Sequence, residues 1–405
     1  MKHTGRLTII LLVAASALLP SCGAPPQASQ TMQSPSALPT TQPTILVPTA
    51  VSTRVPPTRQ LTTSSPTTAP NPELSALTGR AYPAMDYDSR MDRIVLFSGA
   101  EKWPPAPASD TWIYDPAIGK WAKMHPSQSP AGMGTMAYDS HAAQMILYLS
   151  WTLDSKPTYL NSIAPLGETW AYDDQTNSWT NRHAAGTPFG LHGAQLVYDS
   201  ESDRIILFGG AEYPKGDVHK VPMVNDTWAY DYAANAWTKM NPKVQPPTRA
   251  FQAMAYDGKA DRVIIFGGMG TYLAGGPLLA DTWAYDYNTD RWTELKPPIA
   301  PDARWGGRMV YDPVDQRVLL FGGEGGSGTL GDIWTYAYAS NTWTNVSPKP
   351  EATQRVRHTM VFDTKAQQAV VFGGGLGWDS LDNTTWLYAP ATNQWASVSA
   401  NPSIR

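Results

Sequence analysis

The sequence contains one cysteine, Cys22, among its 405 residues. A single thiol can neither form an internal disulfide nor supply a thiolate metal cluster, so stability has to come from packing. Charged residues are also scarce: Lys, Arg, Asp and Glu make up 16% of the chain, and the net charge is −4. This balance provides no basic face, and we therefore expect no nucleic-acid partner. Helical periodicity is absent beyond Cys22, which favours an all-β class.

Motifs for common active sites are missing as well. Gly323-x-Gly325-x-x-Gly328 fits a dinucleotide-binding pattern, but a strand-like segment follows it, and not the helix that phosphate binding requires. The histidines are scattered over different parts of the chain, and only His183, His192 and His358 could seed a metal site. We predict no metal and no cofactor.

The N-terminal residues have the pattern of an export signal. Lys2 and Arg6 precede an apolar run that is too short to span a membrane. The small residue Ser21 before Cys22 resembles a bacterial lipobox, which implies a signal peptide over 1–21 and a lipid on Cys22. Cleavage nearby by the general signal peptidase is the alternative. The first interpretation predicts an exported protein anchored by lipid to the outer side of a bacterial membrane or cell surface.

Residues 22–75 are dominated by Pro, Ser, Thr, Ala and Gln and contain very few charges. Such a segment cannot bury enough apolar surface to fold, so we expect a disordered stalk.

The rest of the chain is a repeat. The pattern Trp-x-Tyr-x6-Trp occurs six times at nearly regular intervals, starting at Trp112, Trp170, Trp228, Trp283, Trp334 and Trp386. Each unit contains four segments of strand character, of which the second is an apolar run closed by glycines, such as Arg204-Ile-Ile-Leu-Phe-Gly-Gly210. Four-stranded units at this spacing predict an all-β, six-bladed β-propeller over residues 79–400. The expected blades are about 79–126, 127–184, 185–243, 244–298, 299–349 and 350–400.

The runs ending Phe-Gly-Gly, followed by Asp-Thr-Trp-x-Tyr-Asp and a second Trp, resemble kelch repeats. The second unit departs most, with Leu147-Tyr148-Leu149-Ser150 where Phe-Gly-Gly is expected. All units begin with the same type of strand, so we expect the first and last blades to pack side by side without exchanging strands.

Loop lengths vary at only one end of the predicted propeller. The interval from the Tyr or Phe of strand one to the first Trp differs between units, from the longest, Tyr138 to Trp170, to the shortest, Tyr311 to Trp334. The other turns keep a nearly constant length. Function favours variable loops on a constant scaffold. Aromatic residues outside the repeat positions fall in these loops, and they predict either a binding platform or an inward-folded plug. They are Trp103, Trp151, Trp305, Trp378, Tyr213 and Tyr272, together with Tyr159, Phe189 and Phe251.

Four arginines recur at the same place, seven positions before the strand-one aromatic residue: Arg80, Arg249, Arg304 and Arg355. Arg308, Arg357 and His358 lie close by in sequence. These residues predict either a cationic collar that binds carboxylates at the channel mouth or hydrogen bonds within the scaffold. The acids two positions before the first Trp, such as Asp110 and Asp281, recur so regularly that we assign them to the scaffold.

Two functional hypotheses follow. The first is a non-catalytic module that binds a protein or glycan through the variable loops. The second is a carbohydrate-active enzyme similar to sialic-acid epimerases (mutarotases), in which the arginines act with Glu212 or Glu324. Galactose-oxidase-like copper enzymes also resemble this fold, but their chemistry needs a cysteine inside the propeller. The single cysteine here, Cys22, precedes the propeller, so we do not expect that activity.

Overall fold

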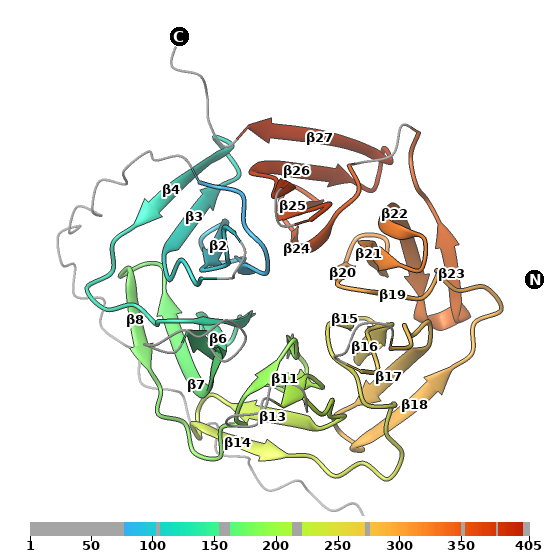
Figure 1. Ribbon diagram of the computed structural model, residues 1–405, viewed down its shortest axis with the longest axis horizontal. Helices are drawn as coiled ribbons and strands as arrows, with labels where there is room; N and C mark the ends of the chain where they lie inside the picture. The colour runs from blue at the N-terminus through green and yellow to red at the C-terminus, as the bar shows by residue number, and fades with distance from the viewer. Residues whose placement is uncertain are drawn as a thin grey trace, which may run out of the picture. The chain divides into compact units, whose positions relative to one another are not determined.

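The structure is a computed structural model that describes residues 77–102, 106–153, 163–212, 221–271, 276–349, 353–377 and 380–399. Within these ranges the chain forms six antiparallel four-stranded blades around a central axis (Figure 1), which confirms the predicted six-bladed β-propeller. Each blade uses one contiguous stretch of chain, and its strands follow one another from the axis outward. No helix in the described ranges is long and apolar enough to cross a membrane.

The strands of the six blades are as follows. Blade 1 contains β1 (Ala84–Asp88), β2 (Arg93–Phe97), β3 (Thr111–Asp115) and β4 (Lys120–Met124). Blade 2 contains β5 (Met133–Asp139), β6 (Gln144–Leu153), β7 (Ile163–Asp173) and β8 (Ser178–Asn181). Blade 3 contains β10 (Gln195–Asp199), β11 (Arg204–Phe208), β13 (Thr227–Asp231) and β14 (Ala236–Lys239).

Blade 4 contains β15 (Ala253–Asp257), β16 (Arg262–Phe266), β17 (Thr282–Asp286) and β18 (Arg291–Leu295). Blade 5 contains β20 (Arg308–Asp312), β21 (Arg317–Gly325), β22 (Gly328–Ala337) and β23 (Thr342–Asn345). Blade 6 contains β24 (Val356–Asp363), β25 (Gln368–Gly375), β26 (Thr384–Ala389) and β27 (Gln394–Ser399). Short strands lie beside two of the blades: β9 (Leu191–His192) and β12 (Ala211–Glu212) by blade 3, and β19 (Arg304–Trp305) by blade 5.

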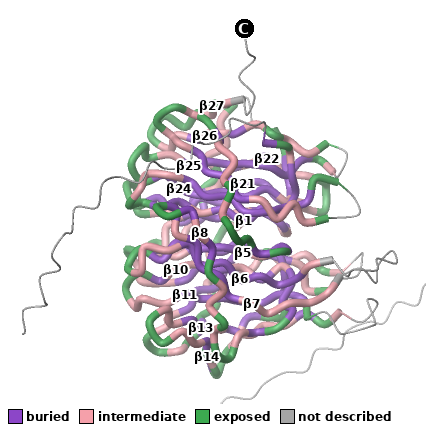
Figure 2. Tube along the Cα trace, turned by 90° about the vertical axis from the view of Figure 1, so that its left-hand side faces the viewer, coloured by how far each residue is buried: buried purple, intermediate pink, exposed green. Residues whose placement is uncertain are grey.

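The second strand of each blade forms the apolar interior. In β2 the run from Ile94 to Phe97 is fully buried, because neighbouring blades cover both faces of the sheet. Figure 2 shows the same distribution, with buried residues in the strands and exposed residues mainly in the loops.

The turns at one end of the propeller are uniform because the same side chains close them. The carboxylate of Asp88 accepts the backbone N–H groups of Arg90 and Met91, and Asp139, Asp199, Asp257, Asp312 and Asp363 make the equivalent bonds. This explains the constant spacing between strands one and two. The turn between strands three and four of blade 5 differs, because Ala337 replaces the Asp found there in blades 1 to 4, and it contains a short 3-10 turn over Tyr338–Ser340.

The second Trp of each repeat joins neighbouring blades. The indole N–H of Trp292 in blade 4 donates to the hydroxyl of Thr227 in blade 3 (2.9 Å), and its ring packs 4.6 Å from that of Phe208. The indole N–H groups of Trp121, Trp179, Trp237 and Trp343 make equivalent bonds. Trp395 is the exception: its buried N–H has no partner, because blade 5 carries Ile333 where the other blades carry Thr.

The ring closes between blades 6 and 1 by the contacts that join the other blades. Trp121 of blade 1 donates to Thr385 of blade 6 (2.8 Å), and the N–H of Gly374 donates to the carbonyl of Arg80 (2.9 Å). Gly374 has a φ of 67°, and a Cβ there would lie 2.4 Å from the carbonyl oxygen of Val356, so only glycine fits. The two blades pack side by side without strand exchange, as expected from the in-phase repeats.

Candidate functional site

A cavity of about 390 Å³ follows the propeller axis and is lined by the first strands of the blades. We call this cavity the central channel. The mouth end is the end where strand one begins and where the loops between strands two and three emerge. Tyr82, Trp151 and His192 line the channel there, and Ser89, Ser200 and Thr364 line it at the opposite end.

Aromatic side chains from different blades meet at the mouth end, and we call this group the aromatic plug: Tyr82, Trp151, His192, Phe251 and Trp305. Tyr82 of blade 1 reaches the ring of Phe251 in blade 4, on the other side of the axis, with 5.7 Å between centroids. His192 lies 5.5 Å from Trp151 and 5.1 Å from Phe251 in edge-to-face contacts. Burial lowers the pKa of His192 to about 4, so it is neutral at physiological pH.

The plug shows which interpretation holds for Trp151, Trp305 and Phe251; Phe189, by contrast, is 50% exposed. Trp151 and Phe251 are buried, while Trp305 is partly exposed and packs against Phe251 at 5.6 Å. The sequence placed Trp151 and Trp305 in loops, but they lie in β6 and β19, because blade 2 extends its middle strands and β19 pairs with β21. These residues fill the mouth and do not form an exposed platform. Trp103, Trp378, Tyr159, Tyr213 and Tyr272 lie outside the described residues.

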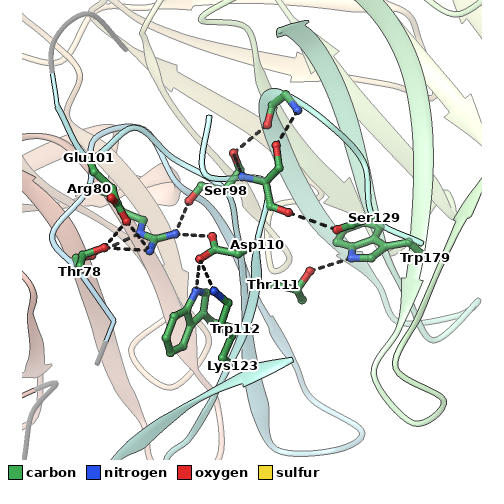
Figure 3. Close-up of polar contacts among 12 residues, drawn as sticks. Thr78, Arg80, Ser98, Glu101, Asp110, Thr111, Trp112, Lys123, Ser129 and Trp179 are labelled. Carbon is green, nitrogen blue, oxygen red and sulfur yellow. Dashed lines mark hydrogen bonds and ion pairs between the residues drawn. The ribbon is translucent and has the colours of Figure 1, made fainter. Parts of the chain in front are cut away.

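The four recurring arginines belong to the scaffold. Figure 3 shows the arrangement in blade 1, where the guanidinium of Arg80 donates to Asp110 (2.7 Å) and to the carbonyl of Ser98 (3.0 Å). The second carboxylate oxygen of Asp110 accepts the indole N–H of Trp112 (2.7 Å). We call this arrangement the Arg–Asp–Trp cluster. It recurs in blades 4, 5 and 6 around Arg249, Arg304 and Arg355, all of which are buried.

These arginines therefore do not form the cationic collar that we considered, because each reaches a carboxylate within its own blade and none lines the channel. Burial alone would raise the pKa of Asp281, but the hydrogen bond and charge of Arg249 lower it below its usual value. Asp382 has the same role beside Arg355, although it comes four positions before its Trp, a spacing that the repeat pattern missed.

Blades 2 and 3 lack the cluster. Ala131 and Leu191 occupy the arginine positions, so no arginine in the described ranges pairs with Glu168, and Asp226 pairs with Lys239 (2.7 Å). In blade 2, β6 and β7 continue past the usual strand ends, and beside blade 3 the short strands β9 and β12 pair. The mouth end is thus built differently over these two neighbouring blades, which also have the two longest intervals from strand one to the first Trp.

Arg308 is the sequence-predicted arginine that does line the channel. Its Nε donates to the carbonyl of His358 (2.9 Å), and its Nη1 donates to the side-chain oxygen of Gln195 across the channel. Among the described residues no carboxylate pairs with it. Desolvation lowers the pKa of Arg308 to about 10, so it remains charged.

Arg357 and His358 also lie near the mouth end. The Nε of Arg357 donates to the hydroxyl of Tyr82 (3.2 Å), and its guanidinium lies 5.2 Å from the centre of the Trp305 ring. His358 is fully buried beside Phe321, and burial followed by the charges of Arg355 and Arg308 holds its pKa well below the usual value.

Asp86 is a channel residue that the sequence analysis missed. Its carboxylate accepts the backbone N–H groups of Tyr87 (2.8 Å) and of Tyr138 in the next blade (2.7 Å). Desolvation outweighs these two bonds and raises the pKa of Asp86 to about 6. Comparison of the six repeats could have identified it, because the residue before the strand-one aromatic is Ala or Val in the other five blades.

The remaining candidates do not assemble into one site. No group of three His, Cys, Asp or Glu side chains able to hold a metal occurs within the described ranges. Glu212 is exposed in β12 and Glu324 is partly exposed in β21; neither lines the channel. The arginine and carboxylate set considered for an epimerase-type activity is therefore not brought together. Cys22 lies outside the described residues.

Comparison with known proteins agrees with the fold. The Attractin/LZTR1 β-propeller family matches residues 215–405. Human Kelch domain-containing protein 10 is 27% identical over 250 residues, which cover 58% of this chain and 52% of that protein. An F-box/kelch-repeat protein of Arabidopsis thaliana is 28% identical over 186 residues, 42% of this chain and 36% of that protein. The chain thus spans about half the length of the first of these relatives and less of the second. Together, the repeats, the blades and these matches support a β-propeller of the kelch-repeat type.

Proposed function

We propose that this protein is a binding module that recognises a protein ligand at the mouth end of its propeller. The observation that carries the proposal is the contrast between the two ends. Six nearly identical Asx turns close one end, whereas the mouth end differs from blade to blade. Variable loops on a constant scaffold are where binding surfaces are usually located. Kelch propellers generally bind proteins, which supports the same conclusion.

Blades 2 and 3 are the part of the mouth end that we assign to the partner. These two blades lack the Arg–Asp–Trp cluster and have the two longest intervals from strand one to the first Trp, so their mouth end departs most from the repeat. Tyr82, Trp305 and Arg357 are partly exposed at the mouth end and offer aromatic and cationic groups of the kind enriched at protein interfaces.

A glycan ligand has less support. Sugar binding by stacking needs an open aromatic face, and two of the aromatic residues of the plug, Trp151 and Phe251, are buried. A protein ligand can use the irregular surface around the plug without such a face.

Site-specific photocrosslinking in the full chain tests the proposal, with four exposed hydrophobic positions as matched probes. Phe189 and Leu376 lie at the mouth end and are 50% and 58% exposed; Ile118 and Val314 lie at the opposite end and are 63% and 54% exposed. A benzophenone amino acid at each position in the producing cells should capture a protein from Phe189, in the loop between blades 2 and 3, and from neither control site; capture of the same protein from Leu376 would show that the interface also reaches blade 6. Capture from the control sites alone, or from none of the four, would show that the proposal is wrong.

We also propose that the propeller is held at the cell surface by a lipid on Cys22. The support is the sequence of the segment 1–22, with its charged start, short apolar run and small residue before the cysteine. Metabolic labelling with an alkyne fatty acid should modify the wild-type chain and leave Cys22→Ser unlabelled and released from membranes. Equal labelling of both would contradict lipidation at this residue.

A further inference from the structure

Two opposite charges face the central channel without pairing with each other. Arg308 is the first residue of β20 in blade 5, and Asp86 is the third residue of β1 in blade 1. The first strands all run from the mouth end toward the opposite end, so the two levels differ by two positions, or about 7 Å along the axis. Arg308 lies next to the plug and Asp86 lies deeper, and no ion pair joins them.

Neither charge is required by the propeller repeat. At the level of Arg308 the other blades carry Ala84, Thr135, Gln195, Ala253 and Thr359, and at the level of Asp86 they carry Ala137, Val197, Ala255, Val310 and Val361. Blades therefore form with small neutral or apolar residues at both levels. The charges are additions to a scaffold that folds without them at every other equivalent position.

Within the part of the chain that the structure describes, both charges are held by neutral groups alone. Arg308 donates to a carbonyl and to the side-chain amide of Gln195, and Asp86 accepts from two backbone N–H groups. A charge that faces a desolvated space without a counter-charge is costly, and such groups are commonly retained for binding. The pKa values support this view, since burial raises that of Asp86 and lowers that of Arg308.

We propose that the central channel is a binding site for a small dipolar molecule. Its anionic group binds Arg308 and Gln195 below the plug, and its protonated amine binds Asp86. The cavity of about 390 Å³ has the size of a small-molecule site, and Val197, Ala255 and Val361 provide an apolar wall for the body of the ligand. Because the aromatic plug fills the mouth end, the ligand enters from the opposite end, past Ser89 and Ser200.

Titration calorimetry with the full chain and three matched probes tests this site. 6-Aminohexanoate carries both charges at a separation comparable to the offset between the two levels, hexanoate carries only the anion, and hexylamine only the cation. The wild-type protein should bind 6-aminohexanoate about tenfold or more tightly than either single-charge probe.

Two variants, one for each charged residue, test which group of the ligand that residue binds. Asp86→Ala should make 6-aminohexanoate bind no better than hexanoate, and Arg308→Thr should make it bind no better than hexylamine. Both variants introduce residues that other blades carry at the same level, so folding is expected; Asp86→Val serves if Asp86→Ala fails to fold. Val197→Ala, at the depth of Asp86 but uncharged, should keep the preference for 6-aminohexanoate. Equal binding of all probes, no binding of any, or an unchanged preference in both charge variants would overturn the proposal.

Discussion

The contacts between blades and the wall of the central channel differ in how closely their residues follow the repeat. Between blades, equivalent positions carry the same residues, and their polar groups satisfy one another, as in the bond from Trp292 to Thr227. In the channel, equivalent positions carry different residues, and the charges of Arg308 and Asp86 have no charged partner among the residues that the structure describes. Residues that recur in every blade stabilise the propeller, and residues that differ from the repeat are the candidates for its specific function.

The strongest test of the repeated scaffold removes a buried cation. Arg304→Ala leaves Asp332 with the indole of Trp334 as its one side-chain partner among the described residues, and we expect a loss of about 3 to 5 kcal/mol in the free energy of unfolding. Urea denaturation measures it. Arg204→Ala is the control, because its pair with Asp231 is partly exposed and should be worth less than about 1 kcal/mol. Similar losses for both variants would show that the cluster is not a main source of stability.

The pH dependence of stability separates the two regions. The pKa of Asp86 is raised from 3.8 to about 6, so the folded state binds its proton more tightly than the unfolded state does. Stability therefore falls as the pH rises through this window, by on the order of 3 kcal/mol. Asp86→Ala lacks this effect, so its stability relative to wild type should rise by that amount between about pH 4 and pH 7.5 in urea titrations.

The uncharged control for this experiment is Val197→Ala, at the same depth in blade 3. Its stability relative to wild type should not change between the two pH values. A flat difference for Asp86→Ala as well would mean that the Asp86 carboxyl is not desolvated in the folded channel.

A single hydrogen bond between blades gives a smaller effect. Thr227→Val keeps the shape of the side chain but leaves the buried indole N–H of Trp292 without an acceptor, which should cost about 1 to 3 kcal/mol. Thr238→Val, at an exposed position of the neighbouring strand β14, should change stability by less than about 0.5 kcal/mol. Equal effects at the two sites would argue against the contribution of the bond.

The sequence predicted the blades because each strand carries its own local pattern, from the apolar run of β11 to the paired tryptophans. It also found the end where loops differ. It did not settle the direction of side chains: Arg249 could equally have pointed at the axis, and only the fold places Asp281 within reach. Asp86 was missed because an Asp before Tyr-Asp is not unusual by itself. It stands out only when the first strands of the six blades are aligned, since the other five carry Ala or Val at this position.

Blade 5 offers the finest test, because it breaks the rule that joins all other blades. Ile333 leaves the N–H of Trp395 unpaired, so the two isosteric variants Ile333→Val and Ile333→Thr differ only in the hydroxyl that the other blades use. Both lose apolar burial relative to isoleucine. Ile333→Thr should nevertheless exceed Ile333→Val by about 1 kcal/mol in the free energy of unfolding, because it completes the hydrogen bond. If Ile333→Val is instead the more stable of the two, burying a hydroxyl between the blades destabilises the protein more than its hydrogen bond stabilises it. The blades would then be held together mainly by the aromatic packing of the second Trp, as in the contact between the rings of Trp395 and Phe321, whose centroids lie 4.7 Å apart.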